Sequence, residues 1–438
     1  MYKVGGFGEY SYQQQEVLNK IISIIEKNYK NFGYQNIDTP AVERNSILLS
    51  KGGEETSKQI FGLYGLAQGG SDLKDYSLRF DLTIPFARYV LDWKDKIPFP
   101  FKRYQIDKVR RGERQQKGRF KEFIQADVDI IWDDDKFNNV LYYDAEVVFL
   151  LYKNLSDIMQ SFCLENTPVL FVNDKRIIDG FLDSVIGDDS DKKQKMIDLI
   201  DKSEKISKQK FFELAGQLCI SEEYVQKIYN FISRQVTYKD LDYISTEFSN
   251  DVFAEGINSL KLFLSNFNNI GEKFEIDPKI VIDFSIVRGL DYYTGIVFET
   301  FLDKNKSTSS VASGGRYENL TYYLDPKTNF SGVGGSIGVS RLFDFIKDSI
   351  NSQGHNNIDY FFINFEDTFP DVVSLAYKFI QDGYKVEIYP VCDKLKKQMQ
   401  LANRKNAKNV VIMGEKEKLN GVYTIKEMSS GEEKIYNI

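Results

Sequence analysis

Histidine is almost absent from this sequence, which has one histidine, three cysteines and two tryptophans in 438 residues. The histidine, His355, lies in a polar stretch at 351–357 that we interpret as a linker. A Ser-His-Asp triad and metal sites built from several histidines are therefore excluded. Any chemistry has to use arginine, carboxylate and tyrosine side chains, with a metal ion supplied by a ligand.

The three cysteines, Cys163, Cys219 and Cys392, are far apart in the sequence and form no Cys-x-x-Cys pair. This spacing suits a reducing compartment and provides neither a zinc site nor a disulfide framework. We expect all three to be small buried side chains.

Long apolar runs are also missing. No run approaches the roughly 18 residues that span a bilayer, and the first ten residues lack the apolar core of a signal peptide. We therefore expect a soluble, cytoplasmic protein with no membrane partner.

The charge is moderately acidic, with a net charge of -7 and a pI near 5.2. This balance argues against unspecific nucleic-acid binding over the whole surface, so an RNA partner would have to meet a local basic patch. The length suits about three domains. With 42% hydrophobic and 14% aromatic residues, the chain can fill several cores.

The stretch 284–300 contains the sequence Arg-Gly-Leu-Asp-Tyr-Tyr-Thr-Gly between apolar segments at 280–282 and 296–298. The apolar segments predict two strands, with Arg288 and the Tyr292–Tyr293 pair at the turn between them. An arginine between apolar strands needs an anion nearby. That anion is either Asp291, in an ordinary hairpin, or the phosphate of a ligand.

The N-terminal part predicts a helix over 13–31, because its apolar residues follow helical spacing, and Gly33 marks its end. An edge strand is expected at 37–40, which ends in a proline. Further on, Thr83 is expected to cap a helix with Pro85 in its first turn, which leaves Asp81 at the end of a strand. A carboxylate at such a position is usually structural.

Two predicted strands within 101–132 flank a polar loop at 110–118, which suggests a hairpin. On the second strand the period of two places four polar side chains on one face: Arg119, Gln125, Asp127 and Asp129. Arg111 and Glu113 reach the same hairpin. The face could simply be solvated, but a cluster of arginines and carboxylates suits a triphosphate with a metal ion better.

Two glycine-rich stretches follow. The first, 309–317, puts Gly314 and Gly315 before a helix expected to begin near Tyr317, where glycine lets a backbone approach a ligand. The second, 331–342, leads into a helix whose predicted core face is Ile337, Leu342, Phe345 and Ile346. It is not a dinucleotide fingerprint, because Ile337 replaces the third glycine and no βαβ unit surrounds it.

Other segments suggest the organisation of the chain. An apolar helix is expected to start at 144–146, and residues 168–271 are interpreted as an inserted, mostly helical module. From 358 onward, strand-like runs alternate with helical segments, as in a compact α/β domain. Within it, 394–408 has six basic residues and no acid, which favours an RNA-backbone contact over an ordinary solvated helix face.

The segment 288–295 resembles the first signature motif of histidyl-tRNA synthetases. Residues 101–132 resemble motif 2 of class II aminoacyl-tRNA synthetases, 331–342 resemble motif 3, and 309–317 resemble the second signature, with Ser313 where glycine is commoner. The matches follow the family's order over essentially the whole chain. The resemblance implies an α+β fold with an antiparallel-sheet catalytic core, a helical insertion and a C-terminal α/β anticodon-binding domain.

The implied domains are a catalytic core at 1–167 and 272–350, interrupted by the insertion at 168–271, which in the family touches the tRNA acceptor stem. The linker at 351–357 and the anticodon-binding domain at 358–438 complete the chain. The N-terminal helix and strand are the dimer-interface segment of the family, so the resemblance also implies a homodimer.

The resemblance implies a histidine–tRNA ligase, which activates L-histidine with ATP and transfers it to the 3′ end of tRNA(His). The residues implied for histidine binding are Asp81, Thr83, Arg111, Gln125, Asp129, Arg288, Tyr292 and Tyr293. Asp129 and Tyr293 would select the imidazole, since they offer acceptors to both ring N–H groups. Arg288 and Arg111 would be catalytic.

The residues implied for ATP binding are Arg111, Glu113, Arg119, Phe123 and Arg341, with Mg²⁺ bridging the phosphates and no dedicated protein site for a metal. The tRNA contacts implied are Gln116, Lys396, Lys397 and Arg404. Gln115 departs from the family pattern, in which proline is usual. Recognition of the tRNA acceptor end by this loop is therefore the role that the resemblance supports least.

An alternative is a non-catalytic, histidine-sensing regulatory relative from histidine biosynthesis. Such relatives lack the terminal RNA-binding domain and lose ATP-binding residues. This chain keeps Arg111, Glu113, Arg288 and Arg341 and has the terminal domain, which favours the enzyme.

Overall fold

The computed structural model of the chain describes residues 4–50, 57–63, 75–112, 120–134, 136–137, 140–287, 292–347 and 358–438. The chain folds into two compact units, residues 1–350 and 351–438. The linker predicted at 351–357, with His355, falls outside the described residues, at the boundary between the two units.

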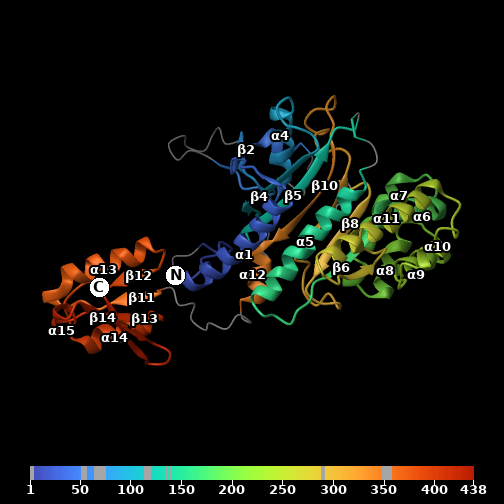
Figure 1. Cartoon of the computed structure of the whole chain (residues 1–438). Coiled ribbons are helices and arrows are strands. Elements are labelled where there is room, and N and C mark those ends of the chain that lie inside the picture. Colours follow the sequence, from blue (N-terminus) through green and yellow to red (C-terminus); the bar gives the residue numbers. More distant parts are fainter. Residues whose placement is uncertain are drawn as a thin grey trace. The chain divides into compact units, whose positions relative to one another are not determined.

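An eight-stranded sheet forms the centre of the first unit, within its described residues (Figure 1). Its central strands pair antiparallel, and only the outermost pair at each edge is parallel. In spatial order the strands are β1 (Gln35–Asn36), β4 (Phe101–Arg110), β5 (Glu122–Trp132), β10 (Ser331–Gly338), β9 (Ala312–Tyr317), β8 (Ile296–Phe301), β6 (Val169–Asp174) and β7 (Lys279–Ile282). A separate antiparallel pair consists of β2 (Val42–Arg44) and β3 (Tyr76–Leu78).

The helices of this unit are α1 (Tyr12–Asn31), α2 (Asn45–Leu48), α4 (Thr83–Trp93), α5 (Tyr142–Ser161), α6 (Lys175–Ile186), α7 (Ser190–Ile200), η2 (Ser203–Lys205), α8 (Lys208–Gly216), α9 (Glu222–Ile232), α10 (Asp240–Ile244), α11 (Asp251–Lys273) and α12 (Val339–Ile346). The helices predicted at 13–31 and 144–152 are thus confirmed. In α1 a capping box between Ser11 and Gln14 satisfies the first backbone donors, and Gly33, with φ +82°, follows the end of the helix.

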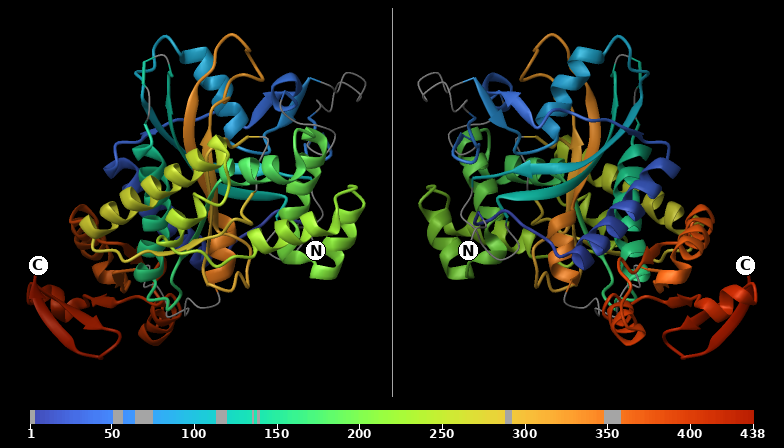
Figure 2. Two further views of the ribbon diagram at one scale, coloured as in Figure 1. Left: turned by 90° about the vertical axis from the view of Figure 1, so that its right-hand side faces the viewer. Right: turned by 90° about the vertical axis from the view of Figure 1, so that its left-hand side faces the viewer.

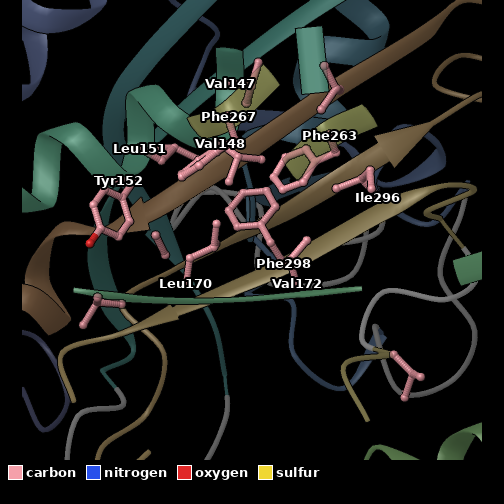
Figure 3. Close-up of a cluster of buried hydrophobic side chains, with 14 of the residues drawn as sticks. Val147, Val148, Leu151, Tyr152, Leu170, Val172, Phe263, Phe267, Ile296 and Phe298 are labelled. Atoms are coloured by element: carbon pink, nitrogen blue, oxygen red, sulfur yellow. The ribbon is translucent and has the colours of Figure 1, made fainter. Parts of the chain in front are cut away.

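Helices α1 and α5 lie side by side against one face of the sheet (Figures 1 and 2). Every second residue of β5 joins their core: Ala126, Val128, Ile130 and Trp132 are fully buried there. Figure 3 shows the adjoining part of this core, where α5, α11, β6 and β8 contribute labelled side chains, among them Leu151, Phe267, Leu170 and Phe298. Burial of this apolar face leaves the polar side chains of β5 on the other face of the sheet.

The glycine-rich and signature segments differ from the sequence-based expectation. The apolar runs at 280–282 and 296–298 are strands, but they are not a hairpin, because β6 lies between β7 and β8. Residues 312–317 form strand β9 instead of leading into a helix at Tyr317. Likewise, Ile337 belongs to strand β10, and the helix begins only at Val339. Glycine suits these strands because neighbouring backbones are very close: a Cβ on Gly314 would lie 2.2 Å from the carbonyl oxygen of Gly334.

The predicted helical module is mostly helical, from α6 to α11, and its helices gather beside β6 and β8 (Figures 1 and 2). Its first residues, however, form β6, a strand inside the main sheet, so the helical segment begins at Lys175. The predicted edge strand at 37–40 was also displaced: the strand is Gln35–Asn36, and Ile37 continues it with one hydrogen bond from its N–H to the carbonyl oxygen of Tyr104.

The second unit is an α/β domain, as predicted. Its five-stranded sheet, in the described residues, has the order β12 (Val386–Ile388), β11 (Tyr360–Phe362), β13 (Asn409–Ile412), β14 (Val422–Glu427) and β15 (Glu433–Asn437). The first three strands are parallel and the last two antiparallel. Its helices are η3 (Glu366–Thr368), α13 (Phe369–Gln381), α14 (Leu395–Arg404) and α15 (Glu415–Leu419).

The three cysteines are exposed, so the expectation of buried side chains was wrong. Cys163 and Cys219 follow helix ends in a left-handed conformation, with φ of 52° and 56°. At such a position the chain turns away from the helix, and the side chain faces solvent. Among the described helices, none is both long and apolar enough to cross a membrane.

Candidate active site

The polar face of β5 is the framework of the site. Alternation along this strand puts Phe123, Gln125, Asp127 and Asp129 on the side of the sheet that faces away from α1 and α5. The prediction that Gln125, Asp127 and Asp129 share one face agrees with the structure, whereas Arg119, the fourth residue of that prediction, lies outside the described residues. Asp127 and Asp129 are nevertheless buried, so this is not a solvated sheet face.

A cavity of about 240 Å³ lies at one end of this face. Four residues that the sequence assigned to substrate binding line it together, although they come from remote segments: Arg111, Phe123, Gln125 and Arg341. The other residues of its wall are Phe120, Ser310, Val311, Ala312, Ser313, Ser336 and Gly338. None of these wall residues was predicted individually as part of the site. The serines in the glycine-rich stretches were the only available signal.

The two arginines of the cavity are held by backbone carbonyl groups. Nε of Arg111 donates to the carbonyl oxygen of Phe80 at 3.0 Å, and its guanidinium carbon lies 5.2 Å from the centre of the Phe123 ring. Nη1 of Arg341 donates to the carbonyl oxygen of Ser310 at 2.6 Å. Each guanidinium has five N–H donors, and the contact with the carbonyl oxygen uses one of them and fixes the orientation of the group.

At the other end of the face, Asp129 has two internal partners. Nη2 of Arg103 lies 2.5 Å from its Oδ2, and the Tyr317 hydroxyl donates to its Oδ1 at 2.7 Å. Burial raises the pKa of Asp129, while Arg103 and the hydrogen bond from Tyr317 oppose this rise. The predicted contact of Asp129 with an imidazole therefore has to share oxygens that already have partners. Each carboxylate oxygen can accept a second hydrogen bond.

Arg103 and Tyr317 are the functional neighbours that sequence reasoning missed. Arg103 is completely buried, and its guanidinium carbon lies 4.0 Å from the centre of the Phe86 ring on α4. The register pairs Arg103 with Asp129 across β4 and β5. An arginine in a strand of alternating polarity is a weak signal, and its partner could be identified only after the strands were aligned.

Two aromatic residues of the first signature lie near Asp129. The rings of Tyr292 and Tyr317 stack with centroids 4.8 Å apart, and Tyr293 is 5.2 Å from Tyr292. Burial raises the pKa of the Tyr293 hydroxyl, and the nearby charge of Asp129 adds to this rise, so Tyr293 stays a neutral phenol. A Cβ on Gly315 would lie 2.8 Å from the Tyr293 ring, so only glycine leaves room for the ring here.

The segment that carries Tyr293 is held by a buried ion pair below it. Arg316 makes a bidentate contact with Asp144 on α5, and the N–H of Thr294 donates to the carbonyl oxygen of Arg316. Both members of the pair are buried. Arg316, in the stretch 309–317, thus holds Thr294, in the stretch 288–295, through a backbone hydrogen bond.

Asp81 and Thr83 lie where β3 leads into α4, and their local roles differ from the prediction. Thr83 is the first residue of the helix and does not cap it. Oδ1 of Asp81 accepts a hydrogen bond from the N–H of Ile84 at 3.2 Å, so the aspartate satisfies a free donor of the first turn. Asp81 is also close enough to raise the pKa of Asp127.

Four predicted site residues lie outside the described part of the chain: Glu113, Gln116, Arg119 and Arg288. Asp291, the alternative partner of Arg288, lies outside it as well. Among the described residues, no group of three or more acidic, histidine or cysteine side chains could hold a metal ion.

The basic helix predicted in the second unit is α14, and ion pairs reduce its charge. Lys397 pairs with Asp393, Lys405 with Glu387 and Lys408 with Asp359. Lys396 and Arg404 are exposed and form no ion pair with the described residues. Of the residues predicted to bind tRNA here, these two have no carboxylate partner among the described residues, whereas Lys397 has one.

Comparisons with known proteins agree with this geometry. The family model described as histidyl-tRNA synthetase matches residues 6–342, and the model described as anticodon binding domain matches residues 358–437. A histidine–tRNA ligase from Clostridium acetobutylicum is 35% identical over 439 residues, which cover 99% of this chain and 97% of the relative. One from Finegoldia magna is 34% identical, over 97% of this chain and 95% of the relative.

Solved structures give the same picture. A histidyl-tRNA synthetase from Nostoc sp. PCC 7120 superimposes with a TM-score of 0.86 at 27% identity, covering 99% of this chain and 96% of that chain. A protein from Bacillus halodurans, described both as an ATP phosphoribosyltransferase regulatory subunit and as a histidyl-tRNA synthetase, has a TM-score of 0.74 at 18% identity, over 92% and 96% of the two chains, and shows the shared fold only. Sequence, fold and family comparison agree that this chain belongs to the histidyl-tRNA synthetase family.

Proposed function

We propose that this protein activates L-histidine with ATP to histidyl-adenylate and transfers the histidyl group to the 3′ end of tRNA(His). The observation that carries the proposal is the convergence of Arg111, Phe123, Gln125 and Arg341 on one cavity beside the buried acidic residues of β5. A nucleotide needs cations and an aromatic surface, and an imidazole needs hydrogen-bond acceptors. The two ends of the β5 face offer these groups.

In the first step, a carboxylate oxygen of histidine attacks the α-phosphorus of ATP and displaces pyrophosphate. Arg111 would bridge the histidine carboxylate and the α-phosphate, Arg341 would contact the γ-phosphate and the adenine, and Phe123 would stack on the adenine. Because carbonyl groups already fix both guanidinium groups, little reorganisation is needed when charge shifts to the phosphates. Glu113, Arg119 and Arg288 would complete the ATP site.

At the histidine end, Asp129 and Tyr293 would bind the imidazole, with Tyr292 packed behind Tyr293. A neutral phenol and a carboxylate accept hydrogen bonds from ring N–H groups, whereas phenylalanine or leucine would leave these acceptors without donors. Arg103 would hold the Asp129 carboxylate in place from the opposite strand. Asp81, Thr83 and Gln125 would contact the amino group.

Mg²⁺ would arrive on the triphosphate and neutralise part of its charge. The cationic side chains at the cavity, Arg111 and Arg341, suit a triphosphate that carries such an ion. The arginines of this chain would then bind the remaining negative charge.

The second step transfers the histidyl group to a ribose hydroxyl of the tRNA, which attacks the carbonyl carbon and releases AMP. Lys396 and Arg404 on α14, together with Lys397, would contact the RNA backbone, and Gln116 the acceptor end. We also propose a cytoplasmic homodimer. The family resemblance assigns its interface to the N-terminal segment with α1 and β1.

Histidine-dependent exchange of pyrophosphate into ATP tests the first step, and charging of tRNA(His) tests the second. We expect exchange with L-histidine and none with L-phenylalanine. Folded protein that shows no exchange would contradict the proposal and favour a regulatory role. Sedimentation of the purified chain tests the dimer.

A further inference from the structure

Asp127 is an acidic residue of the site face that has no role in the reaction as proposed. It lies on β5 between Gln125 and Asp129, and the register places it opposite Ser336 of β10 and Gln105 of β4. Residues two apart on a strand are about 7 Å apart. Asp127 therefore lies midway between the cavity end of the face, at Gln125, and the predicted imidazole end, at Asp129.

Asp127 is 4% exposed, and its Oδ1 has no hydrogen-bond partner among the described residues. The same is true of Oε1 of Gln125, whose Nε2 donates to the Ser336 hydroxyl at 3.1 Å. Buried acceptors without donors cost free energy and are rare in folded proteins. Two of them on adjacent positions of one face point to a ligand that brings N–H donors.

The charges around Asp127 favour a cationic ligand. Arg103 is the cation that faces it from β4, but one guanidinium can balance only one of the two carboxylates, and its Nη2 lies 2.5 Å from Oδ2 of Asp129. The other charged groups near it are acidic: Asp129 on β5 and Asp81 before α4. Among the described residues this leaves an excess of negative charge in a buried place, which a compact cation with several N–H donors would neutralise.

We propose that Asp127 binds the α-ammonium group of the histidine substrate, together with Gln125. This inference rests on the proposed function, because the position midway along β5 corresponds to the amino group only if the imidazole lies at Asp129 and the nucleotide in the cavity. Asp127 is then a second carboxylate for the ammonium group, in addition to Asp81, whose Oδ1 also serves the first turn of α4.

The protonation of Asp127 is consistent with this role. Burial raises its pKa to about 7, and Arg103 and the Ser336 hydroxyl counteract only part of the rise. A bound ammonium group would favour the ionised carboxylate and supply the hydrogen bond that Oδ1 lacks in the free protein.

Binding of three ligands to the full chain without ATP tests the inference. L-Histidine and L-histidinol carry the ammonium group, and 3-(imidazol-4-yl)propionate has the imidazole without it. Asp127→Asn keeps the shape of the side chain. We expect it to lower the affinity for L-histidine and L-histidinol by about 10- to 100-fold, as for loss of a charge-assisted hydrogen bond. Affinity for the propionate should change by less than about twofold.

Asp107→Asn is the matched control. Asp107 lies on β4 opposite Gln125, but it pairs with Arg79 and is partly exposed, so its loss should affect the three ligands equally. Equal weakening of all three ligands by Asp127→Asn, or none, would overturn the inference and leave Asp127 as a second partner of Arg103. If the asparagine variant does not fold, Asp127→Ser gives the same comparison. Failure of the wild-type protein to bind L-histidine or L-histidinol is a different result, which contradicts the proposed function itself.

Discussion

Arg103 and Asp129 lie opposite each other on β4 and β5, and Nη2 of the arginine is 2.5 Å from Oδ2 of the aspartate. Both side chains are buried, so the pair is a salt bridge inside the protein, next to the Phe86 ring. Losing one partner of such a pair leaves an uncompensated buried charge and costs more than losing both.

We therefore expect Arg103→Met to lower the free energy of unfolding by about 3 to 5 kcal/mol. The double variant Arg103→Met, Asp129→Asn should recover part of this loss. Urea unfolding of the two single variants and the double variant gives the coupling between the residues. A coupling near zero would show that the two charges do not stabilise each other.

Gly334→Ala should weaken histidine binding strongly. A Cβ at this position would lie 1.9 Å from Oδ1 of Asp129, so the carboxylate would have to leave the position in which Tyr317 donates to it. We expect histidine-dependent pyrophosphate exchange to fall by on the order of 100-fold. Gly216→Ala, where a Cβ would contact nothing within 4 Å, is the control and should leave exchange unchanged. Full activity of Gly334→Ala would move the imidazole site away from Asp129.

Arg341→Gln should raise the KM for ATP by about 10- to 100-fold, because the side chain would lose its charge while its contact with Ser310 could persist. The affinity for L-histidine in the absence of ATP should stay within about twofold, since Arg341 lies at the cavity end of the site. The ATP dependence of exchange and calorimetric titration with histidine measure the two quantities. Equal losses in both would place Arg341 at the amino acid.

On α14 we expect the double variant Lys396→Ala, Arg404→Ala to weaken tRNA binding more than Lys397→Ala. The reason is that Lys397 already pairs with Asp393, whereas the other two form no ion pair with the described residues. Each lost phosphate contact should reduce the slope of log K against log salt by about 0.7 to 0.9. Binding measured at several salt concentrations checks this, and pyrophosphate exchange should be unaffected. A larger effect of Lys397→Ala would show that its ion pair opens on RNA.

The pKa of Asp127 predicts a pH-dependent stability of the free protein. This pKa is about 7 in the folded state and about 3.9 in the unfolded chain. Between these values the folded state holds the proton more tightly, so the contribution of Asp127 to stability is most favourable below about pH 4 and falls as the pH rises to about 7. Asp127→Asn lacks this fall.

The variant should therefore gain on the order of 1 to 3 kcal/mol relative to wild type at pH 8, and much less at pH 5. Urea unfolding at both pH values, without ligands, measures the gain. An equal difference at the two pH values would show that Asp127 does not titrate in this range.

Much of the architecture follows from local patterns in the chain. The period of two along 122–132 is a property of extended backbone, so it separates Gln125, Asp127 and Asp129 from the apolar residues between them in whatever sheet the strand joins. Helical periodicity likewise gives α1 and α5 and their buried faces. The resemblance to a known family predicted that Arg111, Phe123 and Arg341 bind the same nucleotide. These three residues line one cavity in the structure.

What the local patterns left open depends on contacts between remote segments. Residues 312–317 contain two glycines and were predicted to lead into a helix. They form a strand because their backbone pairs with β8 on one side and β10 on the other. Thr83 looked like a cap, but Asp81 makes the capping contact, since the turn before α4 brings its carboxylate to Ile84. Such outcomes depend on neighbours in the three-dimensional structure, which secondary-structure propensities do not include.

The partner of Asp129 is the clearest case. Alternation along β5 placed the Asp129 carboxylate on the polar face. Its partners follow only from the assembled sheet: the register of β4 against β5 puts Arg103 opposite it, and Tyr317 at the end of β9 donates its hydroxyl to Oδ1. Burial then set the protonation of Asp127, because desolvation depends on everything packed around a group and not on its place in the chain. Side-chain direction is local, whereas charge pairing and desolvation belong to the assembled fold.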